Sequence, residues 1–229
     1  MGPTVGAAPT DLHRLSSGFA PPTVPVMDTS LKAVALVCSL KASPAESSSD
    51  LIARQVLDEL ATHGIDGETV RVADYDVRPG VEDDMGDGDQ WPQILEKITA
   101  ADVLVLATPT WVGHMSSIAQ RVLERLDAQL SATDEQGRPA MFGKVAVSAV
   151  VGNEDGAHKI VADTFQGLND IGFTIPAQGC TYWNNEAMNP KDYADLEETP
   201  SAVSSTIATL SANAAHLARL LRAEQYPPV

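Results

Sequence analysis

Serine and lysine side chains crowd a short segment that follows the first strongly apolar run. The segment reads CSLKASPAESSSD and covers residues 38–50. Its hydroxyl and ammonium groups can donate hydrogen bonds to a phosphate, and the free N–H groups of a helix that begins near Ser49 would point the same way. The candidate ligands are Ser39, Lys41, Ser47, Ser48 and Ser49. A serine-rich turn that caps the helix at Ser48 or Ser49 is an equally supported interpretation, and Glu46 would repel a phosphate unless it points to solvent.

A second segment combines a flat aromatic side chain with residues that shape the backbone. It reads TPTWVGHMSS, residues 108–117, between an apolar run and a helical pattern. Pro109 stiffens the chain, Gly113 permits a close backbone approach or a positive φ, and Trp111 offers a large face with one polar edge. Such a loop can line the edge of a planar ring, which predicts a flat aromatic ligand. Alternatively, Trp111 is a core or interface aromatic; His114 is interpreted as structural.

Two further segments are candidates for the rest of the site. VGNEDGAH, residues 151–158, has two glycines that bracket Asn153 before another helical pattern. It is either a plain turn with Asp155 as the helix cap or a loop that closes over the pyrimidine side of a ring. TYWNN, residues 181–185, follows the last expected strand. Its aromatic and amide side chains predict a substrate rim or, equally, a subunit interface.

The elements that must position these segments alternate along the chain. Short apolar runs predict five strands buried on both faces, at residues 33–37, 70–72, 103–107, 145–151 and 173–175. Helical spacing lies between them, with the longest stripe from Val203 to Leu221. The other helical patterns are Ile52, Val56 and Leu60; Ile118, Val122 and Leu126; and Val161, Phe165 and Leu168. This alternation predicts an α/β three-layer sandwich, a five-stranded parallel sheet with helices on both faces. Ligands of such sheets lie beyond the carboxyl ends of the strands, where the candidate segments begin.

Composition limits the classes of partner and ligand. The formal net charge of −16 argues against nucleic acid and anionic membrane surfaces as partners. Any phosphate must therefore be held by local N–H and hydroxyl groups. Two cysteines, Cys38 and Cys180, form neither a disulfide framework nor a metal cluster, and they suit a reducing cytoplasm. The sequence predicts no metal site, and it interprets the acidic stretch 81–89 as a solvated loop.

The domain organisation follows from the same patterns. Residues 1–30 are rich in Pro, Ser, Thr and Gly and predict a flexible N-terminal arm, so residues 31–225 form the domain. No apolar run approaches the length of a membrane span. Neither GxGxxG after a strand, nor a Walker loop, nor a GxSxG elbow occurs, so dinucleotide, NTP and serine-hydrolase chemistry are disfavoured.

Taken in order over roughly residues 32–180, the three loops resemble the flavodoxin-like NAD(P)H-dependent FMN reductase family. Members carry a Gly/Ser-x-Arg phosphate loop, then Ser/Thr-Pro-x-Tyr/Trp-x-Gly, then a glycine-rich third loop. The resemblance implies that Ser39, Lys41, Ser47, Ser48 and Ser49 hold the FMN phosphate. It places Pro109, Thr110, Trp111, Val112 and Gly113 along the isoalloxazine, and Gly152, Asn153 and Gly156 at its other edge. Lys41 stands where Arg is common, so bidentate phosphate binding is lost, and Val112 stands where a second aromatic is frequent.

The resemblance also implies an activity. FMN would be the cofactor and NAD(P)H the co-substrate, with a hydride passed to the flavin and electrons passed on to a small acceptor such as free flavin or a quinone. No catalytic acid or base is assigned, since hydride transfer requires none. A homodimer or tetramer is expected. Two alternatives stay open: a flavodoxin-type electron carrier, whose acidity suits basic partners, and a flavin-free α/β interaction domain, which Glu46 favours.

Overall fold

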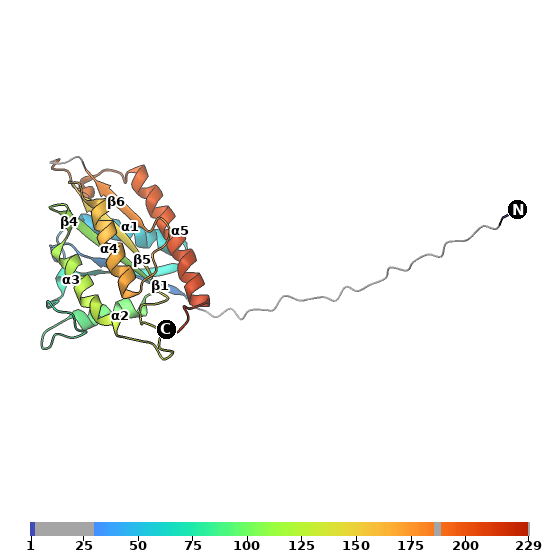
Figure 1. Ribbon diagram of the computed structural model, residues 1–229. Coiled ribbons are helices and arrows are strands. Elements are labelled where there is room, and N and C mark those ends of the chain that lie inside the picture. Colours follow the sequence, from blue (N-terminus) through green and yellow to red (C-terminus); the bar gives the residue numbers. More distant parts are fainter. Residues whose placement is uncertain (3–29, 186–188, 229) are drawn as a thin grey trace.

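Five parallel strands form the central sheet of this computed structural model, which describes residues 1–2, 30–185 and 189–228 (Figure 1). Their order is β2-β1-β3-β5-β6, and the short strand β4 pairs antiparallel with β3. The strands are β1 (Leu31–Val37), β2 (Ile65–Arg71), β3 (Val103–Trp111), β4 (His114–Met115), β5 (Val145–Gly152) and β6 (Cys180–Asn184). The predicted parallel α/β sheet is confirmed. Of the predicted N-terminal arm, residues 3–29 lie outside the described residues.

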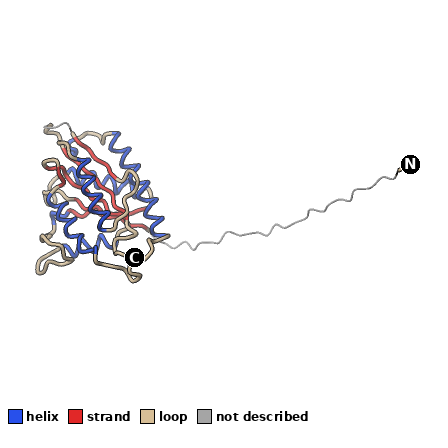
Figure 2. The backbone as a smooth tube through the Cα atoms, viewed as in Figure 1, coloured by secondary structure: helices blue, strands red, loops and turns tan. Residues whose placement is uncertain are grey.

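Helices cover both faces of the sheet, so the strands are enclosed between two helical layers (Figure 2). The helix α1 (Ser48–Thr62) and the helix α5 (Ser201–Ala223) pack on one face with Ala33, Ala35 and Val37 of β1. The opposite face packs Val34 and Leu36 against α2 (Trp91–Ala100), α3 (Ser117–Leu126) and α4 (Ala157–Ile171). The described residues also form three short 3-10 helices, η1 (Val72–Asp74), η2 (Asp127–Leu130) and η3 (Tyr193–Asp195). Burial on both faces explains why the central strands have no polar alternation.

The two edge strands differ from their predicted positions. The prediction of a fifth strand at 173–175 is wrong: Thr174 makes only an isolated bridge with Val145, and β6 begins at Cys180. Pro176 comes directly after residues 173–175 and has no N–H group to donate to a neighbouring strand, so the pairing stops there. β2 starts at Ile65, five residues before its predicted apolar run, because the exposed residues of an edge strand interrupt that run. Both differences arise where only one side of a strand has a partner.

The helical patterns need one correction. In α4 the buried positions include Ile160, Thr164 and Leu168, whereas Val161 and Phe165 are only half-buried. The terminal stripe from Val203 to Leu221 packs within the chain in α5, with Leu217 only half-buried. Within the described part of the chain, no helix is long and apolar enough to cross a membrane.

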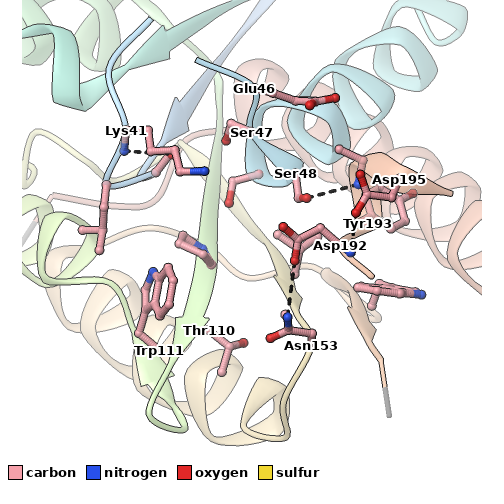
Figure 3. A pocket seen from close by; sticks show the side chains of 18 of the residues that line it. Lys41, Glu46, Ser47, Ser48, Thr110, Trp111, Asn153, Asp192, Tyr193 and Asp195 are labelled. Atoms are coloured by element: carbon pink, nitrogen blue, oxygen red, sulfur yellow. Dashed lines mark hydrogen bonds between the residues drawn. The ribbon is translucent and has the colours of Figure 1, made fainter. Parts of the chain in front are cut away.

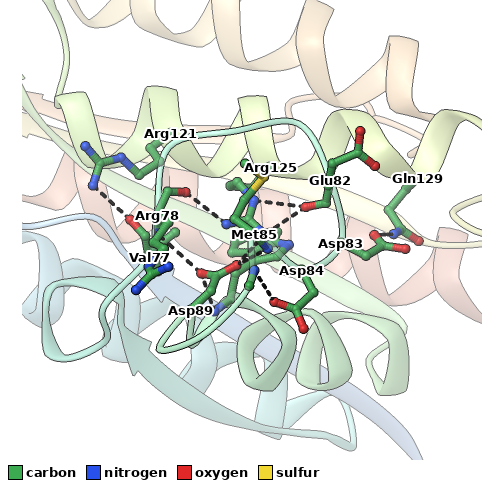
Figure 4. Close-up of polar contacts among 12 residues, drawn as sticks. Val77, Arg78, Glu82, Asp83, Asp84, Met85, Asp89, Arg121, Arg125 and Gln129 are labelled. Atoms are coloured by element: carbon green, nitrogen blue, oxygen red, sulfur yellow. Dashed lines mark hydrogen bonds and ion pairs between the residues drawn. The ribbon is translucent and has the colours of Figure 1, made fainter.

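The acidic stretch 81–89 is not simply a solvated loop, which corrects the prediction. The Asp89 carboxylate lies 2.8 Å from Arg125 Nη2, and neither side chain has any exposed surface. Arg125 also donates to the carbonyl oxygens of Arg78 and Glu82 (Figure 4). Gln129 donates to Asp83 at 2.6 Å. The loop is therefore fastened to α3 and η2 by its own acidic and backbone groups, while several of its other side chains face solvent.

Candidate functional site

The segment after Thr108 is a two-residue β-hairpin, not a plain strand-to-helix loop. β3 continues to Trp111, and Trp111 and Thr110 pair with His114 and Met115 of β4. The turn residues Val112 and Gly113 have φ angles of 54° and 73°, the left-handed pair that two-residue hairpins require. The hairpin raises Trp111 and Val112 above the sheet, where they are 51% and 84% exposed.

A buried hydroxyl network fixes the base of this hairpin. Ser116 Oγ donates to the Cys38 carbonyl oxygen at 2.7 Å, and Ser116 N donates to Thr108 Oγ1 at 3.1 Å. The same serine caps α3 by accepting a hydrogen bond from Ala119 N. The end of β1, the end of β3 and the start of α3 are therefore held as one unit, as buried polar groups require.

The tip of the hairpin is held by the loop after β5. Val112 N donates to Glu154 Oε1 at 2.7 Å. Gly156 lies so close to the turn that an added Cβ would come 2.8 Å from Gly113 Cα. The two segments predicted to flank a ring thus contact each other directly. Sequence reasoning did not assign Glu154 a role, because its contact depends on the hairpin geometry.

A cavity of about 370 Å³ lies at the carboxyl ends of the strands, between these segments and the start of α1 (Figure 3). Ten predicted site residues line it: Ser39, Lys41, Ser47, Ser48, Ser49, Pro109, Thr110, Trp111, Gly152 and Asn153. Val112, Gly113 and Gly156 lie outside the lining and hold the hairpin against its neighbour. Contact of any of these thirteen residues with a ligand stays a prediction.

One end of the cavity is a cradle of backbone donors. Among the hydrogen bonds of the described residues, none uses the N–H group of Glu46, Ser47, Ser48 or Ser49. These four consecutive groups precede and open α1, whose dipole adds positive potential there. Ser47 is the N-cap and accepts from Asp50 N, so the capping interpretation holds at Ser47, one residue earlier than expected. The cap and the cradle coexist, because capping uses the serine hydroxyl and leaves these N–H groups free.

The cavity wall between β6 and α5 was not predicted. Pro190, Asp192, Tyr193, Ala194 and Asp195 line it. Tyr193 donates to Gln55 Oε1 at 2.7 Å, and Ala194 N donates to Ser48 Oγ at 3.1 Å. Burial raises the pKa of the Tyr193 phenol. A capping box between Asp192 and Asp195 was the available signal, but it does not indicate what the turn contacts.

Other side chains complete the wall. Thr110 Oγ1 is buried with no hydrogen-bond partner in the described part of the chain, so a ligand can satisfy it. Glu46, Asp192 and Asp195 bring negative charge to the cavity that Lys41 also lines. His114 Nδ1 lies 2.7 Å from the Val112 carbonyl oxygen, in line with a structural role. No group of three or more candidate metal ligands occurs among the described residues.

The segment 181–185 belongs largely to β6, so its aromatic residues diverge. Trp183 lines the cavity and its ring lies 5.5 Å from that of Tyr193. Tyr182 points to the opposite face of the sheet, where its hydroxyl lies 2.9 Å from His158 Nε2. Neighbouring residues of a strand face opposite sides, so the predicted rim contributes Trp183 to the cavity and not Tyr182.

Comparison with known proteins gives the following similarities. Residues 31–187 match the family model described as NADPH-dependent FMN reductase. The chain is 31% identical to the 8-demethyl-8-aminoriboflavin-5'-phosphate synthase of Streptomyces davaonensis, over 86% of this chain and 80% of that protein. It is 33% identical to the divalent metal cation transporter MntH of Mycobacterium bovis over 84% of this chain, but it spans only 29% of that protein's length.

Solved structures are also similar to this chain. The crystal structure of RosB with the bound intermediate 8-demethyl-8-formylriboflavin-5'-phosphate has a TM-score of 0.77 at 31% identity, covering 86% of this chain and 82% of that one. An archaeal flavodoxin has a TM-score of 0.54 at 10% identity, covering 82% of this chain and 99% of that one. This second likeness concerns the fold alone, and it confirms the expected flavodoxin-like arrangement.

Proposed function

The chain belongs to the NADPH-dependent FMN reductase family, and we propose that it is an oxidoreductase whose cavity binds FMN and accepts electrons from NAD(P)H. The observation that carries this proposal is the row of four N–H groups at residues 46–49 that have no partner among the described residues, beside a cavity with Trp111 at its rim. The final acceptor would be a small molecule such as free flavin or a quinone. A cytoplasmic location stays a prediction.

The donors of the cavity fit a riboflavin phosphate. A phosphate requires several hydrogen-bond donors in an otherwise acidic protein, and the N–H groups of residues 46–49 with Lys41 and the serine hydroxyls supply them. Thr110 Oγ1 is an additional buried group that requires a partner. Bound FMN would supply the redox chemistry. The protein would hold the phosphate, orient the ring beside the hairpin and keep water away from its buried edge.

We expect the apoprotein to bind FMN more tightly than riboflavin, and NADPH or NADH to bleach the bound flavin under anaerobic conditions. The preference follows because only FMN carries the phosphate that the cradle would hold. Titration calorimetry with both flavins and stopped-flow absorbance would measure the two effects. Equal affinities would contradict the phosphate cradle. Reduction by dithionite but by neither nicotinamide would favour the electron-carrier alternative.

A second candidate function is chemical modification of a bound riboflavin 5'-phosphate molecule. The 31% identity with the Streptomyces synthase, over most of both chains, favours it. The same cavity would then hold a substrate rather than a resident cofactor. Mass spectrometry of the flavin recovered after turnover separates the two, since a cofactor returns with unchanged mass and a substrate does not.

We also propose that the protein forms a homodimer or tetramer in which a second copy covers the mouth of the cavity. Leu40, Trp111 and Val112 expose apolar surface there, at 50%, 51% and 84%, and interface cores are enriched in such residues. The stripe of α5 gives no further support, because it packs within the chain.

Light scattering coupled to size exclusion should detect this oligomer. We expect a mass above that of one 24.2 kDa chain, with association tighter at moderate salt because the charge of −16 per chain is then screened. A monomer at low and moderate salt that keeps full NAD(P)H reductase activity would rule out a shared site.

A further inference from the structure

Arg71 lies directly behind the cradle, at the end of β2. Its Nη1 donates to the Ala45 carbonyl oxygen at 2.6 Å. The side chain is only 9% exposed, and its Nε is buried with no partner among the described residues. Sequence reasoning did not single out this residue, because it lies outside the serine-rich loop and ends an edge strand.

The contact with Ala45 orients the first donor of the cradle. A trans peptide is planar, and its C=O and N–H groups point in opposite directions. The only cis bond among the described residues is Ser43–Pro44, so the bond between Ala45 and Glu46 is trans. Because the Ala45 oxygen points to Arg71, the Glu46 N–H points away from it. Glu46 lines the cavity, and its N–H group is one of the four free donors.

The same contact brings positive charge to the loop. Asp50 Oδ2 lies 3.6 Å from Arg71 Nη2, but it is already bound by Arg54 Nε at 2.8 Å. Two guanidinium groups thus share the Asp50 carboxylate, and the Asp74 carboxylate is a further electrostatic partner of Arg71. A cation on a carbonyl oxygen polarises the peptide and strengthens its N–H as a donor. This compensates for the exposed Glu46 carboxylate, the residue that fits a phosphate site worst.

A second hydrogen bond holds the loop that contains Ser43 and Ala45 against the end of β2 and η1. Ser43 N donates to Asp74 Oδ1 at 2.6 Å, and this hydrogen bond lowers the pKa of the Asp74 carboxyl group. Ser43 and Ala45 are therefore both fastened to the end of β2 and to η1, so the loop has little freedom to rotate the Ala45–Glu46 peptide away from the cavity.

We propose that Arg71 is a positioning residue for the flavin phosphate, which acts through the Ala45–Glu46 peptide and makes the site selective for the 5'-phosphate over riboflavin. The proposal rests on the proposed function, since it requires a flavin phosphate in the cradle. Arg71 does not line the cavity, so its effect would be transmitted by the peptide and by its charge.

The test compares FMN and riboflavin binding to the full-length apoprotein by calorimetry. The variant R71M should weaken FMN binding by about tenfold or more, the size of a lost charge-assisted hydrogen bond, and leave riboflavin binding unchanged. R71K keeps the charge without the planar fork and should recover part of the FMN affinity. R54M is the matched control, because Arg54 contacts the same Asp50 carboxylate, is 58% exposed and forms no hydrogen bond to the loop at 43–47. It should leave both affinities unchanged.

The outcomes separate this proposal from the proposed function. If wild-type protein binds FMN no better than riboflavin, the cradle itself is wrong. If wild type prefers FMN and R71M keeps the same preference, or weakens both ligands equally, the role of Arg71 is overturned. Circular dichroism checks that each variant folds. If R71M does not fold, R71K is the deciding variant. A preference of R71K for FMN over riboflavin that equals the preference of wild type and of R54M would overturn the proposal.

Discussion

Replacing Arg125 by methionine should lower the free energy of unfolding by about 3–5 kcal/mol, because the Asp89 carboxylate would then be buried without its cation. Both side chains have no exposed surface, and Arg125 also lies over the Trp91 ring at 5.5 Å. Urea denaturation followed by circular dichroism measures the effect. R138M is the control: Arg138 pairs with Asp134 at 2.7 Å on the surface, where a pair contributes about 1 kcal/mol or less.

The contribution of the Asp89–Arg125 ion pair to folding stability should depend on pH in one direction. Burial opposes ionisation of Asp89, but hydrogen bonds from Arg125 and from backbone N–H groups outweigh it and hold the pKa of the carboxyl well below its usual range. Because the pKa of Asp89 is lower in the folded protein than the value of about 3.9 in the unfolded chain, ionised Asp89 stabilises the protein above that pH. This contribution to stability is lost as the pH falls further. The stability difference between wild type and D89N should therefore be largest near neutral pH and shrink below about pH 4. A difference that is constant with pH would contradict this ionisation.

The central part of the fold was predictable because its strands are buried on both faces. β1, β3 and β5 each lie between two other strands and two helical layers, so they read as continuous apolar runs. The edge strands β2 and β6 have one open side, and their polar residues hide the strand pattern. Local sequence therefore predicts the middle of this sheet better than its margins.

The site residues that come directly after the ends of strands could be predicted from the sequence. Parallel strands bring their carboxyl ends to one edge, which is why the serine-rich loop, Trp111 and Gly152 meet in one cavity. Residues 190–195 follow no such rule, and Arg71 ends β2, the edge strand whose pattern the sequence shows only in part. They are placed by long-range contacts, such as the hydrogen bonds from Tyr193 to Gln55 and from Arg71 to Ala45. Contacts of this kind depend on the packed tertiary structure, and no periodicity in the sequence reports them.

The contact between Gly156 and the hairpin leads to the second prediction with a large expected effect. Gly156 has a φ of 144°, a conformation that residues with a Cβ rarely adopt. A Cβ there would also lie 2.8–2.9 Å from the backbone of Gly113. G156A therefore combines backbone strain of about 1–3 kcal/mol with a collision that only movement of the hairpin can relieve. Such movement would also strain the hydrogen bond from Val112 N to Glu154.

We expect G156A to lower both the stability of the protein and its affinity for flavin, and to weaken riboflavin and FMN alike, because the hairpin carries Thr110 and Trp111 at the wall of the cavity and not the phosphate cradle. G64A is the matched control: Gly64 also has a positive φ, 73°, but no atom of the described residues lies within 4 Å of its added Cβ. It should cost about 1–2 kcal/mol of stability and leave binding unchanged. Denaturation and calorimetry on both variants measure the two effects. If G156A binds riboflavin as well as G64A does, the contact between the two loops does not position the ring end of the site, and Trp111 would have to be held by the β3–β4 pairing alone.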